Sequence, residues 1–172
     1  LCGLIDHTEC EIFTAFRNAL APLLESDSIE GKDYDFIFID CPPSLGILTI
    51  NALAAADSAI IPMQCEYYAL EGLSVITSLL DQLREGNANP NIKIEGILMT
   101  MYDGRTKLSE DVVKEVRKHF GDKVYKTIIP RNVRLSEAPS FGKPVIQYDR
   151  SSKGAQAYLK LAKEFLVRTD KK

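Results

Sequence analysis

Hydrophobic residues recur at helical spacing near the beginning of the chain, between Glu9 and Glu25. This spacing predicts an amphipathic helix with one apolar stripe, which is formed by Ile12, Phe13, Phe16, Leu20, Leu23 and Leu24. Comparable patterns predict four more helices, at residues 45–56, 69–84, 109–120 and 151–168. Ser109 is the expected N-cap of the third of these, and Gly121 follows its last turn.

Short apolar runs alternate with the predicted helices. They are rich in β-branched and aromatic residues and predict buried strands at residues 34–40, 59–63, 93–99 and 124–129. Strands that alternate with helices predict a mostly parallel sheet flanked by helices, which is a three-layer α/β domain. The loop expected at residues 130–149 is long, and such loops in compact domains usually carry function. We expect a single domain over residues 1–172.

Composition supports a globular chain with a core, because 45% of its 172 residues are hydrophobic and 26% are charged. The net charge of -3 conceals an asymmetry between the two parts of the chain. Residues 1–100 hold 4 Lys/Arg and 15 Asp/Glu, whereas residues 101–172 hold 17 and 9. The second part therefore offers a surface for an acidic partner.

Membrane-spanning, secreted and zinc-binding proteins are all disfavoured. The longest apolar runs are interrupted by Asp57 and Gln64, far short of the roughly 20 residues that cross a bilayer. Residues 1–6 lack the basic start of a signal peptide, so we expect an N-terminally truncated cytoplasmic chain. No Cys-X-X-Cys pair occurs, and His7 and His119 are isolated, which favours reduced thiols over a metal site.

One carboxylate has a position suited to nucleotide chemistry. Residues 36–44 read FIFIDCPPS, so a predicted strand delivers Asp40 to its C-terminal end. Ligands of open α/β sheets bind outside those strand ends. A carboxylate there can hold a magnesium-bound water beside phosphates, which is the Walker B role. Many unrelated strands also end in Asp, so this run alone decides nothing.

Five longer segments occur in a fixed order along the chain. They read DCPPS at 40–44, TINAL at 49–53, QCEYYALEG at 64–72, LMTMYD at 98–103 and IPRNVRLSEAP at 129–139. Together they resemble the ParA/Soj family of chromosome and plasmid partitioning ATPases, and the likeness runs from about residue 35 to 166. Such an ordered set is much more specific than any one short motif.

The resemblance implies a P-loop ATPase of the deviant Walker A type, with ATP and Mg²⁺ as cofactors. It also implies an ATP-dependent homodimer that binds DNA without sequence preference and is stimulated by a ParB-type partner. Asp40 matches the family's Walker B aspartate, which holds Mg²⁺ through water, and Pro42 and Pro43 match its switch region. The residues that match segments near the adenine base are Thr100, Met101, Pro130, Arg131 and Asn132. A strand-end Thr and a Pro-Arg-Asn turn also serve structural roles, and that alternative stays open.

The chain departs from the family at its phosphate-binding loop. The family carries K-G-G-x-G-K-[ST], but no Gly-Lys-Ser or Gly-Lys-Thr occurs in this sequence. The loop's lysines, its backbone amides and its magnesium-binding hydroxyl are therefore not supplied here. We expect this chain alone to lack the N-terminal strands, to be inactive as an ATP hydrolase, and to self-associate through an exposed hydrophobic edge.

Basic residues of the second part form a candidate DNA surface. Four lie around the end of the 109–120 helix, namely Arg117, Lys118, Lys123 and Lys126, and two lie at the following loop, namely Arg150 and Lys153. Their segments join neighbouring strands of one sheet, so we expect the six basic side chains to converge into one stripe. Such a stripe would bind DNA and place the protein at the nucleoid. An ordinary solvated helix face is the alternative.

ATP-dependent segregation of a plasmid or chromosome is the leading interpretation. A non-catalytic ParA-like binding fragment and a MinD-like membrane-associated ATPase are alternatives, although residues 160–172 look more like a core-packed helix than a membrane anchor. Cys41 keeps a nitrogenase-reductase-like protein open. Tyr67 and Tyr68 are interpreted as buried ring contacts or as part of a dimer face, and Glu71 as a first-turn carboxylate.

Overall fold

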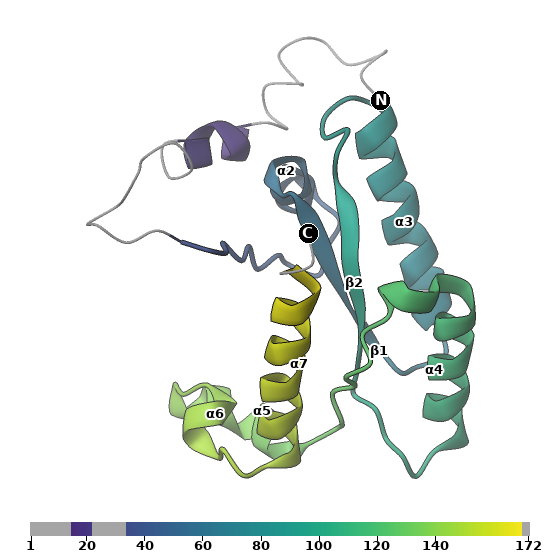
Figure 1. Cartoon of the computed structure of the whole chain (residues 1–172), viewed down its shortest axis with the longest axis vertical. Helices are drawn as coiled ribbons and strands as arrows, with labels where there is room; N and C mark the ends of the chain where they lie inside the picture. The colour runs from purple at the N-terminus through teal and green to yellow at the C-terminus, as the bar shows by residue number, and fades with distance from the viewer. Residues whose placement is uncertain (1–14, 22–33, 170–172) are drawn as a thin grey trace. The chain divides into compact units, whose positions relative to one another are not determined.

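The computed structural model of the chain describes residues 15–21 and 34–169. These residues form two compact units (Figure 1). The first unit comprises residues 15–21, 34–59 and 75–93, and the second comprises residues 60–74 and 94–169. The single-domain interpretation stays a prediction. Most of the predicted 9–25 helix lies outside the described residues. Its described part, residues 15–21, is helical.

The first unit is built around α2 (Ile47–Ala55) and the later turns of α3 (Ala69–Glu85). Both helices confirm predicted ones. Asn89 is buried, and its side-chain amide donates to the Leu53 and Ala56 carbonyls at 2.9 and 2.8 Å, which satisfies the C-terminal end of α2. The Arg84 guanidinium donates to the Ile92 carbonyl at 2.7 Å. The buried apolar side chains of this unit include Ala52, Ala54, Leu80, Leu83 and Ile92.

The predicted strand at residues 34–40 is wrong. The backbone there forms no regular element, and Tyr34, Phe36, Ile37 and Phe38 are all exposed. An apolar run becomes a buried strand only where other strands complete its hydrogen bonds and helices cover its faces. Within the described ranges, the only paired strands are β1 and β2, and this run joins neither of them.

The second unit contains the paired parts of β1 (Ser58–Gln64) and β2 (Lys93–Thr100). The two strands confirm the predicted ones at 59–63 and 93–99 and form a two-stranded parallel sheet. Burial alternates along the end of β1, where Ile61 and Met63 are buried, whereas Ile97, Leu98 and Met99 form a continuous buried run in β2. A central strand covered on both faces has this second pattern.

The predicted strand at 124–129 is wrong as a continuous strand, although both of its ends pair with the β2 segment. Tyr125 donates its amide to the Ile97 carbonyl at 2.9 Å, and Ile129 donates to Met99 at 2.9 Å. Parallel bridges join Ile97 to Val124 and Tyr102 to Pro130. Between these ends, the amides of Lys126 and Thr127 donate to the Glu164 carboxylate, which takes them out of the ladder.

Helix α4 (Lys107–Phe120) confirms the third predicted helix but has a different cap. Thr106 is the N-cap, because its Oγ1 accepts from the Ser109 amide at 3.4 Å. Ser109 is buried within the first turn, so its prediction as the cap is wrong. Gly121 ends the helix with a φ of 52°, a conformation that favours glycine.

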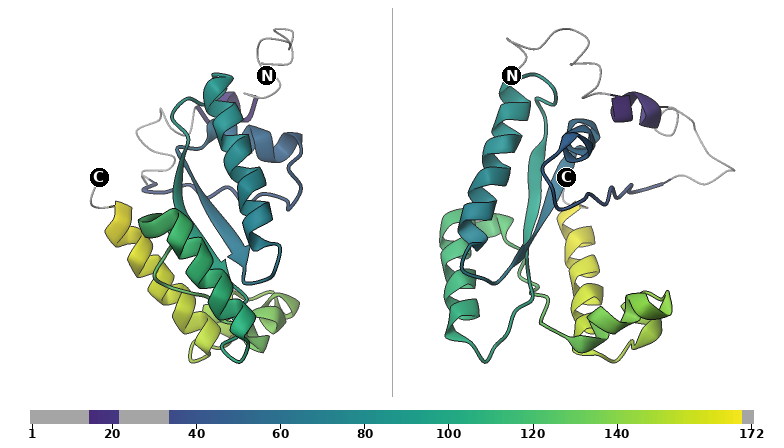
Figure 2. Two further views of the ribbon diagram at one scale, coloured as in Figure 1. Left: turned by 90° about the vertical axis from the view of Figure 1, so that its right-hand side faces the viewer. Right: turned by 180° about the vertical axis from the view of Figure 1, so that it is seen from behind.

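Helix α7 (Lys153–Thr169) confirms the last predicted helix and covers the core of the second unit. Its Ala157, Leu161 and Phe165 pack against the buried cluster formed by Leu98, Tyr125 and Ile129. Within this unit, α7 and α4 lie on opposite sides of the strand segments, as Figure 1 and the right-hand view of Figure 2 show. The sheet is therefore flanked by helices, as predicted for an α/β fold.

The predicted loop at 130–149 is wrong in its local structure. It contains α5 (Val133–Glu137), the 3₁₀ turn η2 (Ala138–Phe141) and α6 (Val145–Tyr148). The Phe141 and Tyr148 rings stack at 4.9 Å, and Gly142 turns the chain with a φ of 60°. A Cβ at Gly154 would lie 2.6 Å from Leu135 Cγ, so glycine lets α7 approach α5 closely.

Candidate functional site

Asp40 lies in an exposed turn that leads into α2. The turn is held by Thr49, whose hydroxyl donates to the Ser44 carbonyl at 2.7 Å and lies 3.5 Å from the Pro42 carbonyl. Thr49 itself is buried, so the anchor of this turn belongs to the core of the first unit. Partial burial, with a further contribution from the Asp40 charge, raises the pKa of the adjacent Cys41 thiol. Cys41 is therefore a weak nucleophile at neutral pH.

The residues after β2 begin with a hydrogen bond and a strained turn. Thr100 donates its hydroxyl to the Met63 carbonyl at 3.1 Å, which ties β2 to β1. Met101 follows with a φ of 53°, a left-handed conformation that costs a non-glycine residue roughly 1–3 kcal/mol. Strained backbone of this kind is concentrated at binding sites.

The structure brings two of the predicted segments side by side. Tyr102 donates its amide to the Ile129 carbonyl at 3.1 Å, and Arg131 donates its amide to the Tyr102 carbonyl at 2.9 Å. Thr100 and Met101 therefore lie at the same edge of the second unit as Pro130 to Asn132. Asp40 and Pro42 belong to the first unit.

Asn132 has an unsatisfied acceptor at this edge. It occupies the N-cap position of α5, but its side chain makes no capping hydrogen bond. Its Oδ1 is buried and finds no hydrogen-bond partner among the described residues. A buried acceptor in that state costs roughly 1–3 kcal/mol.

Charged side chains surround the same edge. Arg105 and Asp103 form an ion pair at 2.6 Å, and Arg131 lies 3.9 Å from a Glu66 carboxylate oxygen. The hydrogen bonds from Arg105, followed by the positive charges of Arg105 and Arg131, hold the pKa of Asp103 well below its usual range. Asp103 therefore stays ionised throughout the physiological pH range.

The six predicted DNA residues fall into two groups. Arg117 donates to the Lys126 carbonyl at 3.3 Å, and Lys118, next to Arg117, pairs with Glu115 at 3.4 Å. Lys123 is exposed in η1 (Gly121–Lys123). Arg150 and Lys153 are exposed at the N-terminal end of α7. The structure thus joins Arg117 to Lys126, which contacts Glu164 near the C-terminal end of α7. Arg150 and Lys153 lie at the N-terminal end of the same helix.

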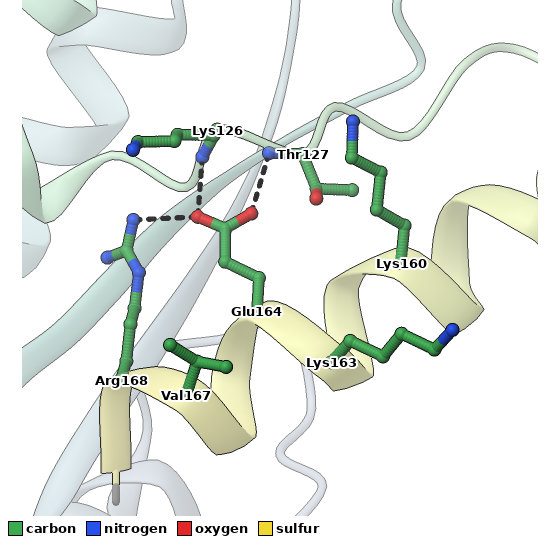
Figure 3. A pocket seen from close by; sticks show the side chains of 7 residues that line it. All are labelled: Lys126, Thr127, Lys160, Lys163, Glu164, Val167 and Arg168. Carbon is green, nitrogen blue, oxygen red and sulfur yellow. Dashed lines mark hydrogen bonds and ion pairs between the residues drawn. The ribbon is translucent and has the colours of Figure 1, made fainter. Parts of the chain in front are cut away.

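A shallow pocket beside Lys126 is lined by basic side chains that were not among the predicted DNA residues (Figure 3). Its lining residues are Lys126, Thr127, Lys160, Lys163, Glu164, Val167 and Arg168. The available signal was the helical spacing of Lys153, Lys160 and Lys163, which places them on one face of the last helix.

The interpretation of Tyr67 and Tyr68 as buried ring contacts is wrong. Their side chains are 77% and 73% exposed, and the two rings meet edge to face at 5.2 Å. Glu71 lies in the first turn of α3, as predicted. Cys65 is buried, and burial raises the pKa of its thiol to about 11. Within the described ranges, no group of three or more His, Cys, Asp or Glu residues is arranged to hold a metal.

Comparison with known proteins identifies the family. The model of the family described as AAA domain matches residues 7–94, just over half of the chain. The chain is 57% identical over 152 residues to the chromosome partitioning protein ParA of Myxococcus xanthus. It is 62% identical over 133 residues to the sporulation initiation inhibitor protein Soj of Bacillus subtilis. The chain belongs to the ParA/Soj family.

The matches to these two relatives cover 88% and 77% of the chain, but 51% and 52% of the relatives. The chain thus spans about half the length of the curated ParA/Soj proteins it matches.

Solved structures agree on a P-loop NTPase fold. Cobyrinic acid a,c-diamide synthase from Mycobacterium smegmatis, with bound ADP and magnesium, is 35% identical with a TM-score of 0.65, and the match covers 88% of this chain and 51% of that one. The septum site-determining protein MinD from Pyrococcus horikoshii, complexed with Mg-ADP, is 25% identical with a TM-score of 0.65, over 88% and 56% of the two chains. No helix in the described ranges is long and apolar enough to cross a membrane.

Proposed function

We propose that this chain forms the magnesium-side and DNA-facing part of an ATPase that partitions chromosomes or plasmids. The observation that supports this most strongly is the 57% identity to a ParA protein over 88% of the chain. Hydrolysis would act as a timer on DNA binding. An ATP-dependent homodimer, sequence-independent DNA and a stimulating ParB-type partner complete the proposal.

Nucleotide roles are proposed for the residues of each unit in turn. Asp40 would hold Mg²⁺ through a water, since carboxylate oxygen is a preferred magnesium ligand, and Pro42 would fix the switch turn behind it. Thr100, Met101 and residues 130–132 would lie along the base. The left-handed backbone of Met101 supports this assignment, because strained backbone is concentrated at binding sites.

A chimera tests the proposal. The aligned segment of Myxococcus xanthus ParA is replaced by this chain's residues, so that the relative supplies its own remaining half. We expect Mg-ATP hydrolysis that DNA and a ParB-type partner stimulate. Asp40→Ala should abolish turnover, because the site loses its magnesium-positioning carboxylate. Asp57→Ala removes another exposed carboxylate of the first unit and is the matched control.

Two outcomes would contradict the proposal. A folded chimera without stimulated hydrolysis would show that this chain cannot perform the role of the ParA segment. Near-normal hydrolysis by the Asp40→Ala chimera would remove Asp40 from the magnesium site and leave the family role intact.

A further inference from the structure

Two residues bulge out of the ladder between β2 and the segment that follows α4. The Tyr125 amide donates to the Ile97 carbonyl at 2.9 Å, and the Ile129 amide donates to the Met99 carbonyl at 2.9 Å. The segment thus advances by four residues while β2 advances by two. Regular parallel strands advance together, so two residues of the segment are left outside the ladder. We call residues 126–127 the bulge.

Glu164 of α7 holds both amides of the bulge (Figure 3). Its two carboxylate oxygens accept from the Lys126 and Thr127 amides at 2.7 and 2.8 Å. The side chain is 16% exposed and pairs with Arg168 at 2.9 Å. A bulge leaves backbone donors unpaired, and a carboxylate can accept two of them in strong, charge-assisted hydrogen bonds. The carboxylate therefore satisfies the donors that the ladder does not use.

The bulge decides where the 130–132 turn lies along β2. If the ladder were regular, the Thr127 amide would take the place of the Ile129 amide at the Met99 carbonyl. The residues after the bulge would then lie two positions further along β2, which is about 6–7 Å at the rise of a strand. In the observed register, the Tyr102 amide donates to the Ile129 carbonyl at 3.1 Å. The bulge therefore keeps the turn beside the residues that follow β2.

The chain that continues β2 has an irregularity of its own at the same place. In a regular parallel ladder, the Ile129 carbonyl would accept from the residue two positions after Met99, which is Met101. It accepts from Tyr102 instead, and Met101 has a φ of 53°. Bulges are frequent beside active sites, where they re-aim side chains. Two irregular segments thus meet at the edge that is proposed to lie along the base.

We propose that Glu164 is a positioning residue of the nucleotide site, which fixes the register of the 130–132 turn by holding the bulge. The inference rests on the proposed function and adds to it a residue that does not itself touch the nucleotide. The β-branched and aromatic side chains of residues 124–129 favour a continuous strand, so two registers compete. Glu164 stabilises the bulged register, because the Thr127 amide would bond to β2 in the regular one.

Steady-state kinetics distinguish a positioning role of Glu164 from a merely structural one. A variant that only unfolds a fraction of the molecules lowers the amount of active enzyme, so the apparent kcat falls and KM is unchanged. A displaced turn weakens binding of the base, so KM for ATP rises while kcat is nearly unchanged. Inorganic triphosphate separates the two parts of the nucleotide, because it carries the phosphates without the base.

The test measures basal hydrolysis by the chimera with Myxococcus xanthus ParA, without DNA or a partner protein. Glu164→Gln keeps the size of the side chain but leaves one oxygen to accept, and it should raise KM for Mg-ATP about tenfold with kcat nearly unchanged. The inhibition constant of magnesium triphosphate should stay at the parent value. Glu164→Asp, which keeps both oxygens on a shorter side chain, should raise KM less. Glu110→Gln makes the same change at an exposed carboxylate of α4 and is the matched control, with parent values throughout.

Hydrogen exchange of the same chimeras reports the register directly. In Glu164→Gln, the amides of Tyr102 and Arg131 should exchange about tenfold faster or more, whereas α4 keeps its protection. Unchanged exchange at these two amides would overturn the proposal, because the turn would keep its place without the carboxylate. Circular dichroism melts confirm that the variants fold.

The kinetic outcomes separate this inference from the proposed function. Equal increases in KM for ATP and in the inhibition constant of triphosphate would overturn the role of Glu164, because the effect would not concern the base. A parent chimera that hydrolyses ATP together with a Glu164→Gln variant that matches it would overturn this inference alone. A folded parent chimera without hydrolysis would overturn the proposed function and the nucleotide role of Glu164 together.

Discussion

Glu164 and Arg168 pair at 2.9 Å on successive turns of α7, and both also bind the backbone of the neighbouring segment. Arg168 donates to the Asp122 and Val124 carbonyls at 3.2 and 3.0 Å, and its guanidinium lies 4.2 Å from the Tyr125 ring centroid. Glu164 accepts hydrogen bonds from the Lys126 and Thr127 amides. The pair thus holds the segment between α4 and the 130–132 turn against α7.

Removing the carboxylate should destabilise the second unit. Glu164→Ala removes the acceptor of the Lys126 and Thr127 amides and one partner of Arg168, and we expect a loss of about 1–3 kcal/mol in the free energy of unfolding. Urea denaturation followed by circular dichroism measures it. Lys163→Ala is the adjacent control, because its side chain is exposed. Equal stability of the two variants would show that the amides find other partners.

The contribution of Glu164 should also depend on pH. Burial alone raises its pKa, but the hydrogen bonds from Lys126, Thr127 and Arg168 outweigh burial and lower it. A lowered folded-state pKa means that this stability is fully present above the unfolded value of 4.5 and is lost as pH falls through the folded value. Denaturation midpoints of the parent chain and Glu164→Gln should therefore converge as the medium is acidified below pH about 4. A constant difference across that range would contradict the assignment.

Gly96 should be the glycine of β2 that tolerates no side chain. A Cβ there would lie 2.2 Å from the Tyr125 ring, and Tyr125 is fully buried. Gly96→Ala should cost about 1–3 kcal/mol through overpacking. Gly72→Ala in α3 is the matched control, because nothing lies within 4 Å of its added Cβ and alanine favours helix. Thermal melts should move in opposite directions, and a neutral Gly96→Ala would show that the ring can shift.

The helices were predicted well because the spacing of apolar residues within each segment is enough to indicate a helix. The 153–169 helix is an example, since Leu161 and Phe165 recur at helical spacing and do pack on the core. The 124–129 strand failed for a reason no local pattern contains. Glu164, 38 residues from Lys126 in sequence, takes the amides that a ladder would use. The 34–40 strand failed because pairing depends on neighbouring strands.

Some features of the candidate site were likewise predictable from the sequence, and others were not. Motif resemblance pointed to Thr100, Met101 and the 130–132 turn, and the structure places these segments side by side. The unsatisfied acceptor of Asn132 and the left-handed Met101 could not be predicted, because burial and backbone angles depend on the assembled fold. Lys160 and Lys163 escaped notice because lysines on a surface helix are ordinary.

Mg-ATP should not bind this chain tightly. Phosphate contacts in P-loop enzymes come mainly from the loop's amides and lysine, and no Gly-Lys-Ser or Gly-Lys-Thr occurs in the sequence. Isothermal titration should show no saturable heat in the micromolar range, and hydrolysis should stay at background. The Myxococcus xanthus relative is the positive control. A clear micromolar isotherm from the chain alone would show that tight nucleotide binding does not need the loop.

The chain should self-associate through its first unit. Large apolar side chains are exposed over a short stretch there, with Phe38 at 71% and Leu48 at 68%. Exposed apolar surface concentrated in this way favours association, whereas single exposed residues are normal. Sedimentation velocity at increasing concentration should therefore show dimers or larger species. Phe38→Ser/Leu48→Ser should shift the distribution toward monomer, while Val133→Ser, which alters one residue of 70% exposure in the second unit, should not. A parent chain that sediments as a monomer at all concentrations would show that this surface is not adhesive.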